Sequence, residues 1–262
     1  MFITIDGKKC ECEKGEYILN IAKRNKIEIP TLCHHAAIAG LASCRVCIVE
    51  VKKPNGKSQV VVSCVYPVDG ECEVFTNNEK IKKERGIVLE LLRLRAPASK
   101  EIEEMCEKYS APKFTSLKPL DGEKCIMCGK CAAACKEFGA SAISTINRGV
   151  YKKISTPYDE PSEVCVGCKS CVEVCPTGAI TYEDTENERI IWGKHFKLVR
   201  CKDCGKVIGT KDQIAFALKH YEIGNKDYLD YCEDCRKKHI AEPLAKTYGI
   251  NPNSQLEELY KN

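Results

Sequence analysis

The sequence has few aromatic residues, no long apolar run and no strong excess of charge. Aromatic side chains make up only 7% of the chain, and no stretch reaches the roughly 18 consecutive apolar residues that a membrane-spanning helix needs. With 41 basic against 37 acidic side chains, the formal net charge is +4. Such a balance argues against a nucleic-acid-binding surface. We therefore expect neither a membrane span nor a nucleic-acid partner.

Signatures of nucleotide binding and of secretion are also missing. No G-x-G-x-x-G follows a predicted strand and no Walker sequence occurs, so we expect no dinucleotide or nucleotide site on this chain. The first residues, MFITIDGKKC, lack the apolar core of a signal peptide. The expected location is the cytoplasm, where thiols stay reduced and available to metals.

Cysteine, by contrast, is abundant, with 20 residues in the chain. Many of them stand in C-x-x-C pairs and triplets, a bunching that is unusual in disulfide scaffolds and typical of metal sites. Because metal binding contributes folding free energy directly, this pattern favours several small cores organised around metal sites over one large core.

The strongest motif occurs twice, as CIMCGKCAAAC and CVGCKSCVEVCP, each with the spacing C-x2-C-x2-C-x3-C. In this bacterial ferredoxin pattern the close triplet binds one [4Fe–4S] cluster and the fourth cysteine ligates the other cluster. Two zinc sites fit less well, because zinc prefers separate sets of four ligands. The predicted ligand sets are Cys125, Cys128, Cys131 and Cys175 for one cluster, and Cys165, Cys168, Cys171 and Cys135 for the second.

A third motif lies in CHHAAIAGLASCRVCIVEV and ends beyond it, with the spacing C-x10-C-x2-C-x16-C. The first interval is longer than in the plant-type pattern, yet the motif follows a predicted helix among strands, as in plant-type ferredoxins. We predict a [2Fe–2S] cluster, with zinc as the alternative, and place Arg45 and the loop amides near the sulfurs. His34 and His35 are not expected to be ligands. The predicted ligands are Cys33, Cys44, Cys47 and Cys64.

Two further pairs, Cys201-x2-Cys204 and Cys232-x2-Cys235, stand 27 residues apart. Two such knuckles converging on one ion are typical of a zinc-ribbon-like module, and zinc is the favoured occupant. A single iron and a further iron-sulfur cluster stay open as alternatives. Four cysteines have no assigned role, and we interpret the first two as small hydrophobic residues: Cys10, Cys12, Cys72 and Cys106.

Local patterns predict several elements around these motifs. Hairpins are expected around Asp6-Gly7 and Pro54-Asn55-Gly56, and a helix between them from about Tyr17. Further expectations are a helix over 77–95, a connecting segment over 98–120, a strand over 189–201, and a helix opened by a capping box at Thr210 and running to about Tyr221.

Residues 1–185 resemble the iron-sulfur region shared by the large iron-sulfur subunit of respiratory complex I, iron-only hydrogenases and some NAD-dependent formate dehydrogenases. Beyond the [2Fe–2S] motif, the resemblance rests on RGIVLELLRLR and on INRGVYKKISTPYDEPSEVCVGCKSCVEVCPTGAI, which separates the two cubane motifs. It implies a β-grasp [2Fe–2S] domain followed by cubane domains that pass electrons between a flavin subunit and a catalytic centre. This sequence departs from the family at its His-x3-Cys-x2-Cys-x5-Cys cluster. We expect that cluster to be absent, because RAPASKEIEEMCEKYSAPKF has no histidine and only Cys106.

The resemblance is nearest to stand-alone electron-transfer subunits of electron-bifurcating hydrogenase or transhydrogenase complexes of anaerobes. It implies hetero-oligomeric assembly with a flavin- and NAD(P)-binding subunit, a small [2Fe–2S] subunit of the thioredoxin-like type and a soluble ferredoxin, with catalysis on those partners. An electron-transfer subunit of an NAD-dependent formate dehydrogenase is the alternative, and an iron-sulfur and zinc nucleic-acid-binding regulator is a more distant one.

The expected fold class is α+β, in four parts. These are a [2Fe–2S] ferredoxin-like domain over 1–76, a helix and linker over 77–120, a 2×[4Fe–4S] ferredoxin domain over 121–185, and a four-cysteine module over 186–262.

Overall fold

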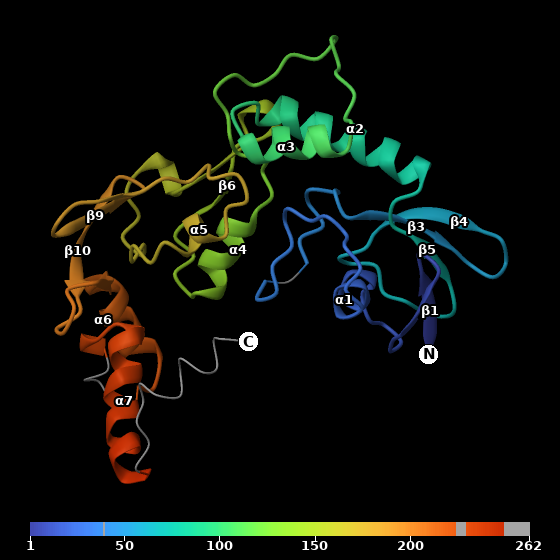
Figure 1. Ribbon diagram of the computed structural model, residues 1–262. Coiled ribbons are helices and arrows are strands. Elements are labelled where there is room, and N and C mark those ends of the chain that lie inside the picture. Colours follow the sequence, from blue (N-terminus) through green and yellow to red (C-terminus); the bar gives the residue numbers. More distant parts are fainter. Residues whose placement is uncertain (39, 224–228, 249–262) are drawn as a thin grey trace. The chain divides into compact units, whose positions relative to one another are not determined.

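A computed structural model describes residues 1–38, 40–223 and 229–248 of the protein (Figure 1). The chain divides into two compact units. Unit 1 comprises Met1–Glu163 and Ser170–Thr181, whereas unit 2 comprises Val164–Lys169 and the chain from Tyr182 onward. Among the described residues, no helix combines the length and the apolar character that crossing a membrane requires.

Unit 1 begins with a five-stranded sheet in the order β2-β1-β5-β3-β4. Strands β1 and β5 are parallel, and the other neighbours are antiparallel. Both predicted hairpins are confirmed, and positive φ at Asp6 (45°) and Gly7 (82°) forms the first turn. The strands are β1 (Phe2–Ile5), β2 (Lys8–Glu11), β3 (Ile48–Lys52), β4 (Ser58–Val62) and β5 (Glu73–Phe75).

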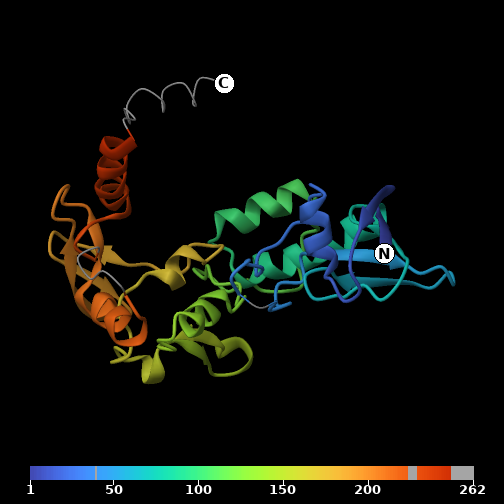
Figure 2. The same ribbon diagram turned by 90° about the horizontal axis from the view of Figure 1, so that it is seen from below.

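Helix α1 (Ile18–Arg24) packs on this sheet (Figures 1 and 2). Alternate residues of the strands, such as Ile3 and Ile5, point to the same face and meet Ile18 and Ile21 of the helix. Each of these four side chains is at most 2% exposed, and burying one contributes about 1.5–3 kcal/mol. This core fixes the two ends of the loop that carries three of the predicted [2Fe–2S] ligands.

Two packed helices follow the sheet, α2 (Glu79–Arg95) and α3 (Lys100–Lys108). Helix α2 confirms the helix predicted over 77–95. Helix α3 corrects our expectation of a plain connecting segment over 98–120. The hydroxyl of Ser99 accepts a hydrogen bond from the Ile102 amide, and Ile102 and Cys106 place one buried face on the helix. The polar composition of the segment conceals this face, which spans only two turns.

The rest of unit 1 contains short elements around the cubane motifs. Helices α4 (Lys130–Glu137) and α5 (Ser170–Glu173) pack against each other. The segment between the motifs contributes a two-stranded sheet of β6 (Ser144–Ile146) and β7 (Lys153–Ser155), with 3-10 turns η1 (Gly149–Tyr151) and η2 (Pro157–Asp159).

Unit 2 is a four-stranded sheet in the order β11-β10-β9-β8, with helix α6 against β10 and β11. The continuous strand expected over 189–201 is wrong, because Trp192 (φ 53°) and Gly193 (φ 71°) form a turn between β9 and β10. The predicted cap at Thr210 is confirmed by its bond from the Gln213 amide. The elements are β8 (Glu183–Asp184), β9 (Glu188–Ile191), β10 (Lys194–Arg200), β11 (Val207–Thr210), α6 (Lys211–His220) and α7 (Glu233–Tyr248).

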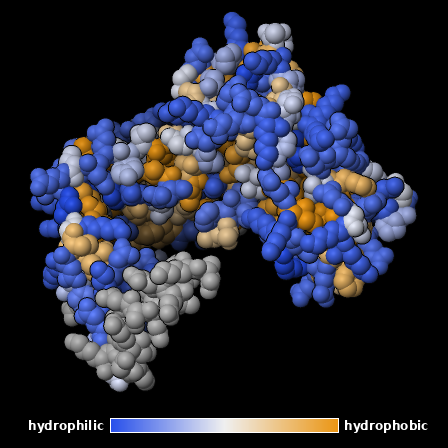
Figure 3. Space-filling view, viewed as in Figure 1, coloured by the Kyte–Doolittle hydropathy of each residue, from blue (hydrophilic) through white to orange (hydrophobic). Residues whose placement is uncertain are grey.

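The surface seen in Figure 3 is mainly hydrophilic.

Candidate metal centres

The four cysteines predicted to hold a [2Fe–2S] cluster are all buried in unit 1, with 1–4% of each residue exposed. Cys33, Cys44 and Cys47 lie on the loop between α1 and β3, and Cys64 lies just after β4. A Cβ atom at Gly40 would lie 2.7 Å from a methyl carbon of Val65, so the loop closes tightly over the residues next to Cys64.

Hydrogen bonds to two of these sulfurs favour thiolates, the form that binds metals. The side chain of Cys44 and the backbone amides of Cys44 and Ser43 lower the pKa of Cys33 to about 5. The Cys64 thiol likewise lowers the pKa of Cys47 to about 6. The predicted placement of loop amides near the sulfurs is thereby confirmed. Arg45 has an exposed side chain, and its proximity to the sulfurs stays a prediction.

The two neighbouring histidines make hydrogen bonds away from the cysteines. The Nδ1 atom of His34 lies 3.1 Å from Nζ of Lys23, and Nδ1 of His35 accepts from the amide of Ala37 (3.2 Å). That neither histidine is a ligand stays a prediction.

Arg85 is a residue near this site that the sequence analysis missed. It is 1% exposed, and its Nε and Nη2 atoms donate to the carbonyls of Val46 (3.0 Å) and Ile48 (2.8 Å), which flank Cys47. Nη2 also donates to the carbonyl of Thr76 (2.9 Å), and burial lowers the pKa of the guanidinium. A sequence signal existed, because Arg85 occupies a position on the apolar face of α2.

The two cubane motifs adopt the same backbone conformation at matched positions. The third residues, Met127 and Gly167, have φ of 54° and 66°, and the fifth residues, Gly129 and Lys169, have φ of 80° and 64°. Left-handed residues alternating with right-handed ones turn successive amides to one side of a loop, which suits an anionic cluster. The predicted duplication is therefore present in the backbone as well as in the cysteine spacing.

The fourth cysteines of the two motifs are also matched. Ala142 donates its amide to Sγ of Cys135 (3.2 Å), and Ala179 donates its amide to Sγ of Cys175 (3.3 Å). In the first motif, Met127 donates to Sγ of Cys125 (3.4 Å). Amide donors stabilise negative charge on sulfur, so these residues fit thiolate ligands of an iron-sulfur cluster.

The cubane cysteines are divided between the two units. Cys128 and Cys131 are buried, and burial raises the pKa of both thiols, that of Cys131 to about 12. Unit 1 contains Cys125, Cys128, Cys131, Cys135, Cys171 and Cys175, whereas unit 2 contains Cys165 and Cys168. The assignment of particular cysteines to particular clusters stays a prediction.

The C-terminal pairs meet at one point in unit 2. The Sγ atoms of Cys201, Cys204, Cys232 and Cys235 all lie within 4.8 Å of one another, and those of Cys204 and Cys232 are 3.6 Å apart. The first pair forms the turn between β10 and β11, and the second lies at the start of α7. Burial raises the pKa of Cys201, but backbone amides at 203, 204 and 232 outweigh that effect and lower it to about 6. The arrangement offers a thiolate to a metal ion.

The remaining cysteines lie in or beside hydrophobic cores. Cys10 and Cys12 are at most 3% exposed in the core of the sheet, and Cys72 packs against the same core. Cys106 contributes to the core between α2 and α3, where burial raises its pKa to about 11.

Three family models match the chain. The 2Fe-2S iron-sulfur cluster binding domain matches residues 2–79, and two 4Fe-4S dicluster domain models match residues 119–182 and 164–208. The matches follow the order of the cysteine motifs described above.

Relatives among characterised proteins cover part of this chain. The NADP-reducing hydrogenase subunit HndD of Solidesulfovibrio fructosivorans is 32% identical over 213 residues, which is 68% of this chain and 35% of the relative. The NADH-ubiquinone oxidoreductase 75 kDa subunit of Reclinomonas americana is 29% identical over 208 residues, which is 68% of this chain and 29% of the relative. The chain thus spans about a third of the length of these relatives.

The fold also matches a solved structure. A chain in the crystal structure of an NAD+-reducing [NiFe]-hydrogenase in the H2-reduced state gives a TM-score of 0.56 at 21% identity. The match covers 68% of this chain and 85% of that chain.

Proposed function

This chain is a homologue of the iron-sulfur region found in the NADP-reducing hydrogenase subunit HndD and in the 75 kDa subunit of NADH-ubiquinone oxidoreductase, and we propose that it is the electron-transfer subunit of a multi-subunit NAD(P)H-linked oxidoreductase. The observation that carries the proposal is the repeated cubane loop next to a buried four-cysteine [2Fe–2S] site. Both are built on the domains that the family models match.

The ligand sets are those that the spacing predicts. Two [4Fe–4S] clusters would use the interleaved cubane cysteines, and a [2Fe–2S] cluster would use the buried set around Cys44 and Cys47. Bound clusters supply one-electron chemistry. The protein holds the thiolates, buries most of the ligand cysteines away from water, and directs amides such as those of Ala142 and Ala179 at the sulfurs.

The C-terminal cysteines favour a single ion over a fourth cluster. Sulfurs at the corners of a tetrahedron around one ion stand about 3.8 Å apart when each metal–sulfur bond is ~2.3 Å. The 3.6 Å separation of Cys204 and Cys232 and the 4.8 Å limit for all four agree with that size. We propose zinc as the occupant, with a single iron as the second candidate.

The complex is proposed to be a flavin-based, electron-bifurcating hydrogenase or transhydrogenase. The support is the kind of relative that the chain has, an NADP-reducing hydrogenase subunit and an NADPH-Fe(3+) oxidoreductase subunit, together with the absence of a nucleotide-binding motif in this sequence. A flavin- and NAD(P)-binding partner and a soluble ferredoxin would complete the electron path.

Spectroscopy and activity of the purified chain test the proposal. After reduction, EPR is expected to show signals of both cluster types, because the sites belong to two cluster classes. The chain alone is expected to oxidise neither NADH nor NADPH, and to accept electrons from NAD(P)H only after the flavin-bearing partner is added. Turnover of NAD(P)H by the isolated chain, or absence of the [4Fe–4S] signals, contradicts the proposal.

A further inference from the structure

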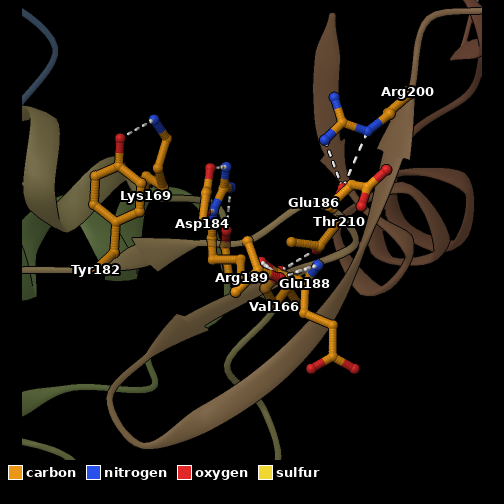
Figure 4. A network of polar contacts seen from close by, with 11 residues as sticks. Val166, Lys169, Tyr182, Asp184, Glu186, Glu188, Arg189, Arg200 and Thr210 are labelled. Atoms are coloured by element: carbon orange, nitrogen blue, oxygen red, sulfur yellow. Dashed lines mark hydrogen bonds and ion pairs between the residues drawn. The ribbon is translucent and has the colours of Figure 1, made fainter. Parts of the chain in front are cut away.

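Side chains on β9, β10 and β11 donate hydrogen bonds to the second cubane loop, and Figure 4 shows one of these contacts, between Thr210 and Val166. Three consecutive carbonyl groups each accept a hydrogen bond from a different side chain. Lys194 Nζ donates to the carbonyl of Cys165 (2.8 Å), Thr210 Oγ1 to that of Val166 (2.5 Å), and Arg189 Nη1 to that of Gly167 (3.0 Å). In the first cubane loop, the carbonyl matched to that of Gly167 belongs to Met127, and it accepts from the hydroxyl of Ser43 (3.2 Å).

Side-chain packing against Gly167 also restrains this loop. A Cβ atom on Gly167 would lie 2.9 Å from two ring carbons of Phe196 and 3.1 Å from a methyl carbon of Thr210. Phe196 is 1% exposed and Thr210 is fully buried. Thr210 is fixed further, because its hydroxyl also accepts from the amide of Gln213 at the start of α6. The loop therefore has little freedom to rotate its peptide groups.

On the premise that the proposed function is right, we propose that β9, β10 and β11 form a clasp that sets the reduction potential of the [4Fe–4S] cluster bound by Cys165 and Cys168. The clasp comprises Arg189, Lys194, Phe196 and Thr210. These four residues follow the triplet motif in the sequence, so the cysteine spacing does not predict their role.

Peptide geometry explains how the clasp acts. In a planar trans peptide, the carbonyl of one residue and the amide of the next point in opposite directions. Fixing the carbonyls of Cys165, Val166 and Gly167 toward the clasp therefore fixes the next three amides toward the other side of the loop. At the matched place in the first loop, the Met127 amide donates to Sγ of Cys125. Amides directed at sulfur raise the potential of a cluster by stabilising its reduced, more negative state.

Each cation of the clasp also has an acidic neighbour. Arg189 forms two hydrogen bonds to Asp184 (2.7 and 2.8 Å). Lys194 forms an ion pair with Asp212 at 3.9 Å. The ammonium group of Lys194 also donates to the carbonyl of Cys165, so removing its charge beside the loop disfavours the reduced cluster. Arg189 acts as a positioning residue.

The four-cysteine site connects to the clasp through the chain. Lys194 and Phe196 lie on β10 and Thr210 lies on β11, and the turn that joins these strands carries Cys201 and Cys204. Strand pairing runs from this turn to Leu198 opposite Thr210. An ion bound there would brace the turn of the β10–β11 hairpin and so hold the two strands of the clasp together.

Redox titration of the full-length protein, followed by EPR, tests the inference. In Lys194→Gln, one of the two [4Fe–4S] transitions is expected to move to lower potential. At the wild-type midpoint its reduced-to-oxidised ratio should fall by about threefold or more, a shift of roughly 30 mV at 59 mV per tenfold. The other [4Fe–4S] transition and the [2Fe–2S] transition should stay in place.

Matched variants separate the clasp from general effects. Lys197→Gln removes the same charge from an exposed position on the same strand and should leave every potential unchanged, whereas Lys194→Arg keeps the charge and should restore the wild-type value. Thr210→Ser keeps the hydroxyl and should behave as wild type, whereas Thr210→Val should lower the same transition as Lys194→Gln. Equal potentials in Lys194→Gln and Lys197→Gln, with normal clusters in the wild type, overturn the clasp and leave the proposed function standing. Absence of clusters in the wild type instead removes the proposed function.

Discussion

Arg85 is a buried cation that donates hydrogen bonds only to neutral oxygens among its described contacts. Two of these are the carbonyls on either side of Cys47, and the others belong to Thr76 and Asn77. A buried charge is costly unless an opposite charge compensates it. The thiolates of a bound [2Fe–2S] cluster would supply that charge, since Cys47 lies between the two carbonyls that Arg85 holds. At the scale of single residues, Arg85 therefore couples the folding of α2 to the ligand loop.

Replacing Arg85 with methionine tests this coupling. The change leaves three buried carbonyls without a donor, each worth about 1–3 kcal/mol, so we expect a loss on the order of 3 kcal/mol and a melting temperature lower by roughly 6 °C or more. Circular dichroism during thermal unfolding measures the effect. Lys82→Met on the same helix is the control, because its exposed ion pair with Glu79 contributes at most about 1 kcal/mol. Equal melting temperatures for the two variants contradict the role of Arg85.

At the scale of elements, the second cubane loop depends on the sheet of unit 2. Gly167 has a φ of 66° and its Cα faces the ring of Phe196, so any side chain there meets both a backbone penalty and a clash. The loop and the β10–β11 hairpin therefore have to form together, although α5, β8 and β9 lie between them in the sequence.

Gly167→Ala is expected to lower the amount of [4Fe–4S] cluster per chain, because a Cβ only 2.9 Å from the Phe196 ring must displace the loop. Iron content and the intensity of the [4Fe–4S] EPR signal measure the loss. The control is Gly56→Ala, whose φ of 80° carries a similar penalty of about 1–2 kcal/mol with no atom within 4 Å of the new Cβ. Adding Phe196→Leu to Gly167→Ala should restore part of the cluster. The explanation fails if the two alanine variants lose iron equally.

At the scale of the whole molecule, the two units differ in what stabilises them. Unit 1 contains aliphatic cores around the sheet and around α2 and α3. The core that joins α7 to the β10–β11 hairpin consists of Cys201, Cys232 and Cys235 with two partly buried neighbours. The ion pairs nearby, such as Lys206 with Asp234, are exposed and worth little. We therefore expect the described part of this junction to depend on the proposed metal ion.

Cys201→Ala tests that dependence. We expect zinc near one per chain in the wild type and its loss in the variant, while iron stays at about ten atoms per chain because the three clusters use other cysteines. Limited proteolysis should then cut within residues 182–248 and spare residues 1–163. A wild-type protein with no zinc and with one iron atom more than the three clusters require would support the single-iron alternative. Protection of residues 182–248 from the protease in the variant would contradict the metal's structural role.

Cysteine spacing was enough to predict the iron-sulfur domains that the family models match. Cluster ligands and the residues that shape their loops lie within a few positions of one another, as in the run from Cys125 to Cys135, so their spacing predicts both the loops and the repeat. The hairpin turns at Asp6-Gly7 and Pro54-Gly56 and the cap at Thr210 were predicted for the same reason, because turn and cap preferences are local.

The surroundings of those ligands follow from contacts in the folded chain. Helix α3, the turn at Trp192, Arg85 behind Cys47 and the clasp on the second cubane loop all depend on contacts between residues far apart in the chain. Lys194 and Cys165 are 29 positions apart, and Thr210 and Val166 are 44 apart. Cysteine spacing constrains neither pair, because a hydrogen bond to a carbonyl places few demands on local sequence. The classes of iron-sulfur domain were therefore predictable from the sequence, whereas the contacts around their loops required the folded chain.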